Sequence, residues 1–353
     1  MSWTNRKSSR TTCCVRKTCE ASSLKEIGGY LEFEHLGGRE YYPGLLKLNL
    51  GRTAIAWYLT SAGCRTVYVP RYLCESVTDA IRLAGIRMIP YSVDERLVPQ
   101  LPAEIAGKKL PPDTFLFLLN PYGQLTGKSV LRYKEIYGNL LADYTQAFFQ
   151  RPSENVPTVY SVRKYFGVTD GAYLSSDRPL PLPEEQDESH ARYGHVLGRF
   201  EEPASAFYQA MLDNAHSYEG ASVSRMSALT ENLLGGLDYT EIAGKRNRNF
   251  LALHEKLAGR NLLYTEQLFT VPEAPFAYPF YAEDGRAIRR KLAEKKIYVP
   301  TYWSNVISEN EPDTVEYRYA ADILPLPCDQ RYGPSEMEAV SSAVLEILKG
   351  DSL

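Results

Sequence analysis

Two ionisable residues near the middle of the chain each follow a short apolar run. Asp143 comes directly after Leu140–Ala142, and Lys164 comes shortly after Thr158–Ser161. An enzyme that holds a pyridine ring needs a carboxylate opposite the ring nitrogen, and a lysine amine can form a Schiff base with an aldehyde on that ring. The pair therefore predicts a site for pyridoxal 5′-phosphate.

A glycine turn offers a second part of such a site. Gly51 precedes Arg52, Thr53 and a stretch with helical spacing of apolar residues. Free backbone N–H groups and the dipole at a helix start favour an anion, so this turn can bind a phosphate, and Ser161 can add a hydroxyl. A glycine before a helix is more often a plain turn, and a loop Asp or Lys is more often solvated. The signals gain weight from occurring together.

The elements that must position these residues alternate between short apolar runs and stretches with helical spacing. Such alternation predicts an α/β fold in which a mostly parallel, buried sheet lies between helices. Ligands bind beyond the carboxyl ends of the strands in such sheets, so we expect Asp143 and Lys164 to converge at that edge. The expected strands are Thr66–Val69, Arg87–Tyr91, Thr114–Leu119, Leu140–Ala142 and Thr158–Ser161, and the expected helices between them are Thr53–Ala62 and Ser76–Leu83.

A series of short motifs runs along the chain from about residue 25 to about residue 345. They are Gly51–Ile55, Val69–Tyr72, Asn120–Gln124, Asp143 with Gln146, Lys164, Gly167–Gly171, Arg225–Ser227 and Pro327–Tyr332. In this order they resemble the motifs of the DegT/DnrJ/EryC1/StrS family of fold-type-I, pyridoxal-phosphate-dependent aminotransferases. The resemblance implies a large domain, with a mixed, mostly parallel sheet between helices, and a smaller C-terminal α+β domain.

The resemblance implies a role for each matching position. Lys164 would form the Schiff base with the cofactor and then carry the proton between substrate and cofactor carbons. Asp143 would pair with the protonated pyridine nitrogen, and Gln146 would contact the hydroxyl side of the ring. Arg52 and Thr53 fall where the family binds the phosphate, chiefly through backbone N–H groups. The Arg52 side chain either adds a charge to the phosphate or faces the substrate.

Two positions depart from the family pattern. Cys74 stands where many relatives stack an aromatic residue on the pyridine ring, so either stacking is weaker or Tyr72 takes over. Val223 or Ser224 stands where many relatives donate an Asn from the neighbouring subunit to the phosphate. Arg225, which follows directly, is a candidate for contact with the substrate.

The chain is expected to divide into three parts. Residues 1–23 are rich in Arg, Lys, Ser and Thr and have almost no aliphatic residues, which predicts a disordered tail. Residues 24–235 should form the large cofactor-binding domain, and residues 236–353 the small C-terminal domain. In the small domain we expect helices at about Thr240–Ala258, Arg286–Glu294 and Ser335–Leu348, and a strand at Lys296–Val299.

An aromatic pair, Tyr302 and Trp303, follows that expected strand. It can line the substrate entrance, as the matching segment does in relatives. It can equally belong to a core edge strand, because aromatic residues serve both purposes. Both interpretations stay open at the level of the sequence.

Composition narrows the classes of function. With 353 residues, 44% of them hydrophobic, the chain can bury the cores of about two domains, and its net charge of −3 does not suit nucleic acid. No apolar run is long enough for a membrane helix and the start lacks a secretory signal, so we expect a cytoplasmic protein. The six cysteines and five histidines show neither disulfide nor metal-ligand spacing, so we expect free thiols and no metal.

One function and two alternatives are expected. The resemblance implies an aminotransferase that moves an amino group from an amino acid, glutamate by analogy, to a nucleotide-linked keto sugar in two half-reactions. It also implies a homodimer, since relatives build each active site from two subunits. The departures at Cys74 and Val223 motivate the alternative of a cofactor-binding protein without transaminase activity, acting as a sensor or partner. Another pyridoxal-phosphate reaction, such as dehydration, is weaker because the family's dehydratases lack the lysine.

Overall fold

The computed structural model describes residues 27–263 and 273–350. By its contacts the chain divides into two compact units, residues 1–35 and 36–353. Residues 27–35, the described part of the first unit, carry no helix or strand, and the tail predicted at 1–23 lies outside the described residues. The boundary expected between residues 235 and 236 stays a prediction.

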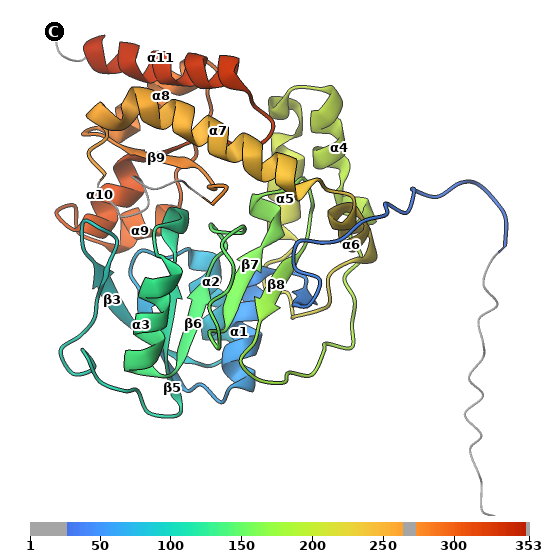
Figure 1. The fold of residues 1–353 in the computed structure, drawn as a ribbon, viewed down its shortest axis with the longest axis vertical. Coiled ribbons are helices and arrows are strands. Elements are labelled where there is room, and N and C mark those ends of the chain that lie inside the picture. The colour runs from blue at the N-terminus through green and yellow to red at the C-terminus, as the bar shows by residue number, and fades with distance from the viewer. Residues whose placement is uncertain (1–26, 264–272, 351–353) are drawn as a thin grey trace, which may run out of the picture. The chain divides into compact units, whose positions relative to one another are not determined.

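The second unit is built on an eight-stranded sheet (Figure 1). Its strands are β1 (Leu46–Leu48), β2 (Thr66–Pro70), β3 (Arg87–Val93), β4 (Pro99–Gln100), β5 (Thr114–Leu119), β6 (Leu140–Asp143), β7 (Thr158–Ser161) and β8 (Ala172–Ser175). They lie in the order β1-β8-β7-β6-β5-β2-β3-β4. The strands from β7 to β3 in this order run parallel, while β1, β8 and β4 pair antiparallel at the two sides. This confirms the mixed, mostly parallel sheet.

All five strands predicted from apolar runs are confirmed. The central strand β5 shows why: from Phe115 to Leu118 no side chain is more than 1% exposed, so both faces of the sheet are covered. A strand that is buried on both faces has a continuous apolar sequence instead of an alternating one. Runs of strand length between Gly, Pro or Asn residues therefore located these strands.

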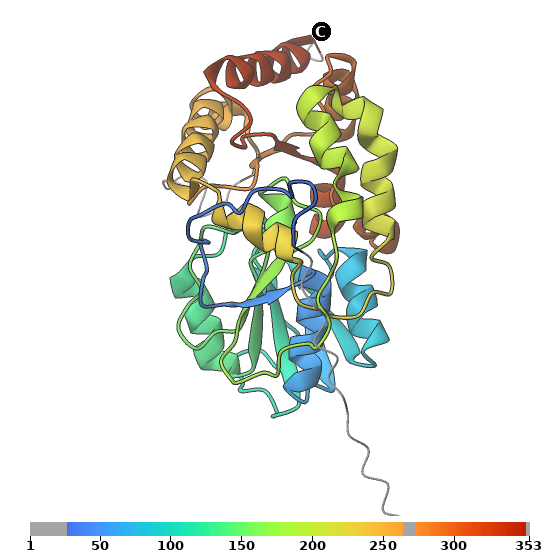
Figure 2. The same ribbon diagram turned by 90° about the vertical axis from the view of Figure 1, so that its right-hand side faces the viewer.

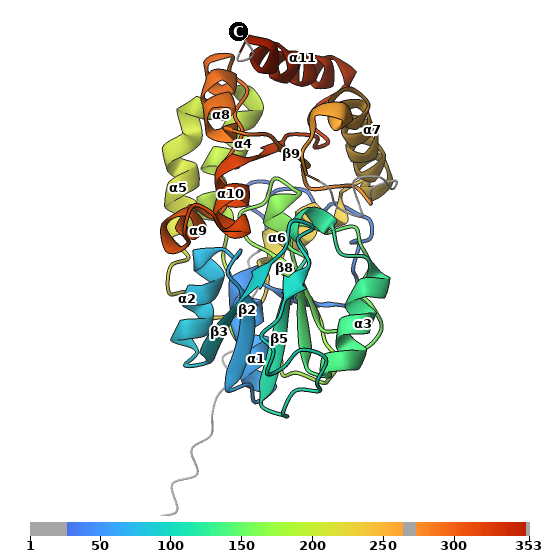
Figure 3. The same cartoon turned by 90° about the vertical axis from the view of Figure 1, so that its left-hand side faces the viewer.

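Helices cover both faces of the sheet. α1 (Gly51–Ser61) and α2 (Glu75–Leu83) lie on one face, and α3 (Gly127–Tyr137) lies on the other (Figure 2, Figure 3). The helices predicted at Thr53–Ala62 and Ser76–Leu83 are thus confirmed. Each turns its apolar side to the sheet, which is what an amphipathic spacing requires.

The C-terminal part adds a two-stranded sheet, in which β9 (Tyr278–Tyr281) and β10 (Ile323–Leu326) pair antiparallel. Helices surround it, and the long α7 and α11 pack against each other (Figure 1). No helix among the described residues has the length and apolar character to cross a membrane. The remaining helices are α4 (Gly194–Glu201), α5 (Tyr208–His216), α6 (Ala228–Gly235), α7 (Tyr239–Leu257), α8 (Gly285–Glu294), α9 (Ser304–Glu309), α10 (Val315–Asp322) and α11 (Pro334–Gly350).

The three helices predicted in this part are confirmed as α7, α8 and α11, but the strand predicted at Lys296–Val299 is wrong. Lys296 has a φ of 61° in the turn that ends α8. A residue in this left-handed region interrupts the extended path that a strand needs. The residues after it form no ladder with any described strand.

Candidate active site

Asp143 and Lys164 lie at the carboxyl edge of the sheet. β6 ends at Asp143, and its parallel neighbour β7 ends at Ser161. A short 3-10 turn, Val162–Lys164, follows β7 and places the lysine at the same edge. Asp143 is 2% exposed, and each of the two charges shifts the pKa of the other residue. The structure therefore brings the partly buried Lys164 close enough to the buried Asp143 for their charges to interact.

Burial dominates the electrostatics of this pair. It lowers the pKa of Lys164 from the ordinary lysine value, while the Asp143 carboxylate acts in the opposite direction. Burial raises the pKa of Asp143, against a hydrogen bond of 2.8 Å from the Thr145 N–H and against the charge of Lys164. A lysine with a lowered pKa has a larger neutral fraction, and the neutral amine is the form that attacks an aldehyde.

The start of α1 lies against the end of β7. A Cβ placed on Gly51 would come within 3.3 Å of Thr145 Cγ2 and 3.8 Å of Ser161 Cβ, so only glycine allows this approach without displacing a neighbour. Leu50, the N-cap residue, gives no side-chain cap, which leaves the first N–H groups of the helix available to an anion. The Thr53 hydroxyl already donates to the Asn49 side-chain oxygen at 2.7 Å, so Thr53 would contact an anion through its backbone N–H.

Gln146 carries a buried donor that has no partner. Its Oε1 accepts from the Tyr122 N–H at 2.8 Å, whereas its Nε2 is buried without a hydrogen bond to any described residue. Buried polar groups in proteins are almost always paired, so an orphaned amide donor marks a place for a ligand acceptor. A carboxylate, an amine, an uncapped helix start and this amide donor match the nitrogen, aldehyde, phosphate and hydroxyl of pyridoxal phosphate. The residues present fit the cofactor.

The structure shows where the residues that depart from the family pattern lie. Cys74 is the N-cap residue of α2 and lies close enough to Lys164 to affect its pKa, whereas Tyr72 is buried with its ring 4.4 Å edge-on from Trp303. Whether Tyr72 takes part in stacking stays a prediction. Arg52 and Val223 line a groove beside α2 that is separate from the cleft around Lys164.

A cleft of about 600 Å³ opens beside Lys164. The Phe276 ring lies 5.6 Å from the lysine Nζ, and Tyr302 stacks on that ring at 5.7 Å. Tyr302 therefore faces the cleft, while Trp303 is absent from its walls. Arg225 is absent too: its guanidinium donates to the Glu184 carbonyl at 3.3 Å. The charged residues on the cleft walls are mostly cationic, namely Arg163, Lys164, Arg199, Arg246 and Arg331 against Asp329.

Neither a family model nor a curated protein sequence matches the chain. Solved structures do: the sugar aminotransferase CalS13 from Micromonospora echinospora is 17% identical, with 86% of this chain and 87% of that chain covered and a TM-score of 0.59. A DegT DnrJ EryC1 StrS aminotransferase from Brucella abortus is 13% identical, with 86% and 85% covered and a TM-score of 0.56. NtdA from Bacillus subtilis, solved with bound cofactor PMP, is 14% identical, with 86% and 73% covered and a TM-score of 0.58.

This chain has the fold of the DegT/DnrJ/EryC1/StrS aminotransferases. At these identities the likeness concerns the fold. Within this fold, the parallel neighbours β6 and β7 position Asp143 and Lys164 at the same edge of the sheet.

Arg246, on α7, holds the lysine segment of the aminotransferase fold in place. It is 1% exposed, and its guanidinium donates to the carbonyls of Tyr165 (3.2 Å) and Pro275 (2.9 Å) and to Gln330 Oε1 (2.8 Å). Gln330 also donates to the Tyr165 carbonyl at 2.7 Å. No role was predicted for Arg246 or Gln330. The sequence did indicate that Arg246 is buried, because it shares helical spacing with the buried residues Phe250, Leu253 and Leu257.

Arg246→Met is expected to lower the free energy of unfolding by about 3 kcal/mol, because buried carbonyl oxygens lose their donor. The measurement is urea unfolding followed by circular dichroism. Arg248→Met is the matched control: this side chain lies on the same helix but is 66% exposed, and its loss should cost less than about 0.5 kcal/mol. Equal midpoints for the two variants would contradict the tethering role.

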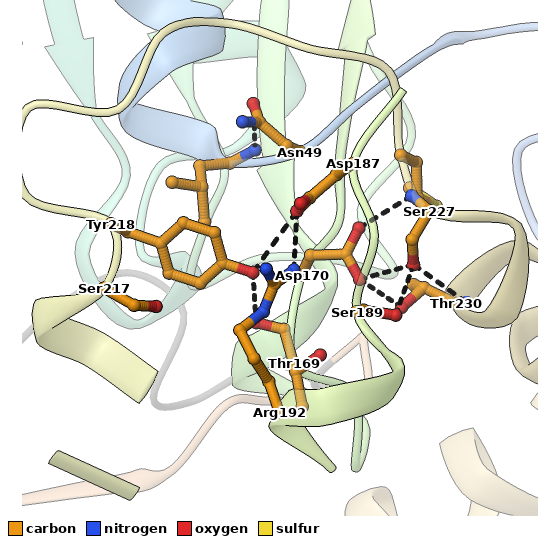
Figure 4. Close-up of polar contacts among 12 residues, drawn as sticks. Asn49, Thr169, Asp170, Asp187, Ser189, Arg192, Ser217, Tyr218, Ser227 and Thr230 are labelled. Carbon is orange, nitrogen blue, oxygen red and sulfur yellow. Dashed lines mark hydrogen bonds and ion pairs between the residues drawn. The ribbon is translucent and has the colours of Figure 1, made fainter. Parts of the chain in front are cut away.

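Asp170, in the Gly167–Gly171 loop, fixes that loop to the start of α6 (Figure 4). Its buried carboxylate accepts from the Ser227 N–H and hydroxyl, both at 2.8 Å, and from the Thr230 hydroxyl. Gly171 has a φ of 115°, and a Cβ there would lie 2.4 Å from a Val162 methyl group, so the loop requires glycine. This motif therefore has a structural task in the chain: it anchors the segment that follows the lysine.

Proposed function

We propose that this protein is a pyridoxal-phosphate-dependent aminotransferase. The observation that carries the proposal is the pair formed by the buried Asp143 and the partly buried Lys164 at one sheet edge, flanked by the uncapped start of α1 and the orphaned amide of Gln146. Each of these protein groups is suited to bind a different functional group of the cofactor. A solved structure with the same fold contains the cofactor PMP, which supports the choice of cofactor.

The residues of the site would bind different parts of the cofactor and transfer the substrate proton. Bound pyridoxal phosphate supplies an electron sink for negative charge at the substrate carbon. Asp143 keeps a proton on the pyridine nitrogen, and Gln146 Nε2 donates to the ring hydroxyl oxygen. The α1 N–H groups and the Ser161 hydroxyl hold the phosphate. Lys164 Nζ would take the proton from the substrate carbon as a general base and, once protonated, give it up again as a general acid.

The substrates we propose are an amino acid donor, glutamate, and a keto sugar linked to a nucleotide. The cationic walls of the cleft suit an anionic donor and an anionic acceptor. CalS13, which shares the fold, is a sugar aminotransferase, and this also supports a sugar acceptor. We further propose a homodimer, as the resemblance to the family implies.

The test follows the two half-reactions separately. Purified protein loaded with pyridoxal phosphate is titrated with glutamate in the absence of an acceptor. The visible absorbance of the bound aldehyde form should fall, and one molecule of 2-oxoglutarate should form for each molecule of cofactor converted. Addition of a keto sugar should restore the absorbance and yield an amino sugar by mass spectrometry. A protein that binds the cofactor yet converts it with no amino donor would contradict the aminotransferase and favour a sensor or partner protein.

A further inference from the structure

Arg163, in the turn that carries Lys164, forms no ion pair with an acidic side chain of the described residues. It lines the same cleft as the lysine. Its guanidinium lies 5.2 Å from the centroid of the Tyr218 ring and, among the described residues, takes part in no hydrogen bond or ion pair. Burial lowers the pKa of Arg163, and the charges of Arg52 and Arg192 act in the same direction, while Tyr218 and Asp170 act against them. A cation in such a place is costly unless an anion pairs with it.

A second arginine on the same ring provides the contrast. Arg192 lies 4.8 Å from the Tyr218 centroid, but its guanidinium donates to Asp187 at 2.8 Å (Figure 4). The Tyr218 hydroxyl lies 3.3 Å from the same carboxylate oxygen. Asp187 is therefore engaged by Arg192 and Tyr218. The Asp170 carboxylate, whose charge also reaches Arg163, accepts hydrogen bonds from Ser227 and Thr230, so neither carboxylate forms an ion pair with Arg163.

Arg163 lies beside the anion-binding start of α1. Ser161, two residues earlier, is in contact range of the Gly51 position, and Tyr218 lines the same groove as Arg52 and Thr53. Arg163 itself lines the cleft of Lys164. It thus stands between that cleft and the corner formed by α1 and the end of β7.

We infer that Arg163 binds the phosphate of pyridoxal 5′-phosphate, together with the N–H groups at the start of α1 and the hydroxyl of Ser161. The inference rests on the proposed cofactor. A phosphate monoester carries nearly two negative charges at neutral pH, and a helix start supplies only about half a positive charge. An arginine adds a full charge and parallel donors that match phosphate oxygens. Since Arg163 and Lys164 are on one chain, this charge compensation needs no partner subunit.

The experiment compares pyridoxal 5′-phosphate with pyridoxal, which lacks the phosphate. Arg163→Gln should weaken the binding of the phosphorylated probe by roughly 10- to 100-fold, the loss expected for a charge-assisted contact, and should leave pyridoxal within about twofold. Dissociation constants come from quenching of protein fluorescence. Arg192→Gln is the matched control. It also removes an arginine that lies over the Tyr218 ring, but the charge of Arg192 is already paired with Asp187, so little change is expected for either probe.

Two results would overturn the inference while the proposed cofactor stands. One is an unchanged affinity of Arg163→Gln for pyridoxal phosphate; the other is an equal loss for pyridoxal, which would mean that the arginine supports the fold and not the phosphate. A wild-type protein that binds neither probe would instead overturn the proposed function as well. Should Arg163→Gln fail to fold, Arg163→Lys keeps the charge and loses the parallel donors, and it should still bind pyridoxal phosphate less tightly with pyridoxal unaffected.

Discussion

Lys164→Ala is expected to abolish covalent attachment of pyridoxal phosphate and to lower the rate of amino transfer by roughly 10⁴-fold. The lysine supplies both the amine that bonds the cofactor and the base that moves the substrate proton, so neither step has a substitute. The other cations of the cleft are arginines, which stay protonated and cannot act as the nucleophile.

The measurement is reduction with borohydride followed by the mass of the intact protein. Wild-type protein should gain one cofactor per chain, located on the peptide that contains Lys164, and the variant should gain none. Lys134→Ala is the control, because this half-buried lysine of α3 pairs with Asp177, does not line the cleft and should leave labelling unchanged. Labelling of Lys164→Ala at the wild-type level would contradict the assignment.

Asp143→Asn is expected to slow amino transfer by about 10²- to 10³-fold, the usual effect of losing one electrostatic contact to the reacting group. The amide has nearly the same shape but cannot hold a proton on the pyridine nitrogen. The same change should shift the pKa of Lys164 in the cofactor-free protein further downward, since the Asp143 charge now raises it against burial. The variant should therefore combine slower turnover with a lysine that is neutral at lower pH.

Single-turnover rates measure the first effect, and the pH dependence of borohydride-trapped adduct measures the second. Asp177→Asn is the control, because that carboxylate forms an ion pair with a different lysine, Lys134, and neither of these two residues lines the cleft of Lys164. A loss of less than about tenfold in rate would contradict the contact with the ring nitrogen. A rise in the pKa of Lys164 would contradict its electrostatic pairing with Asp143.

The five parallel strands from β7 to β3 could be predicted from their apolar runs, whereas the antiparallel strands were not predicted. β1 and β8 have three and four residues, and they pair across the chain with Leu46 opposite Leu174. The same holds for β9 and β10, which join Tyr281 to Ile323. β6 and β7 are as short as β8, β9 and β10, so length alone is not the reason. The pairing of the missed strands is decided by tertiary contacts.

The same distinction applies to the site. Asp143 and Lys164 could be brought together from sequence because they end neighbouring parallel strands. The lack of an ion pair at Arg163 could not be predicted from the sequence. It depends on Asp187 pairing with Arg192, and no residue spacing encodes that choice of partner. Local patterns therefore locate the edge of the sheet, while the competition among charged side chains appears only in three dimensions.

The tether on the Tyr165 carbonyl has a consequence for the order of events during synthesis of the chain. Both of its side-chain donors come from far downstream, Arg246 from α7 and Gln330 from the segment before α11. A ribosome that has just finished the sheet has produced Asp143 and Lys164 without either donor. We expect the lysine segment to take its final place only when residue 330 has left the ribosome, so cofactor loading should follow the synthesis of both donors.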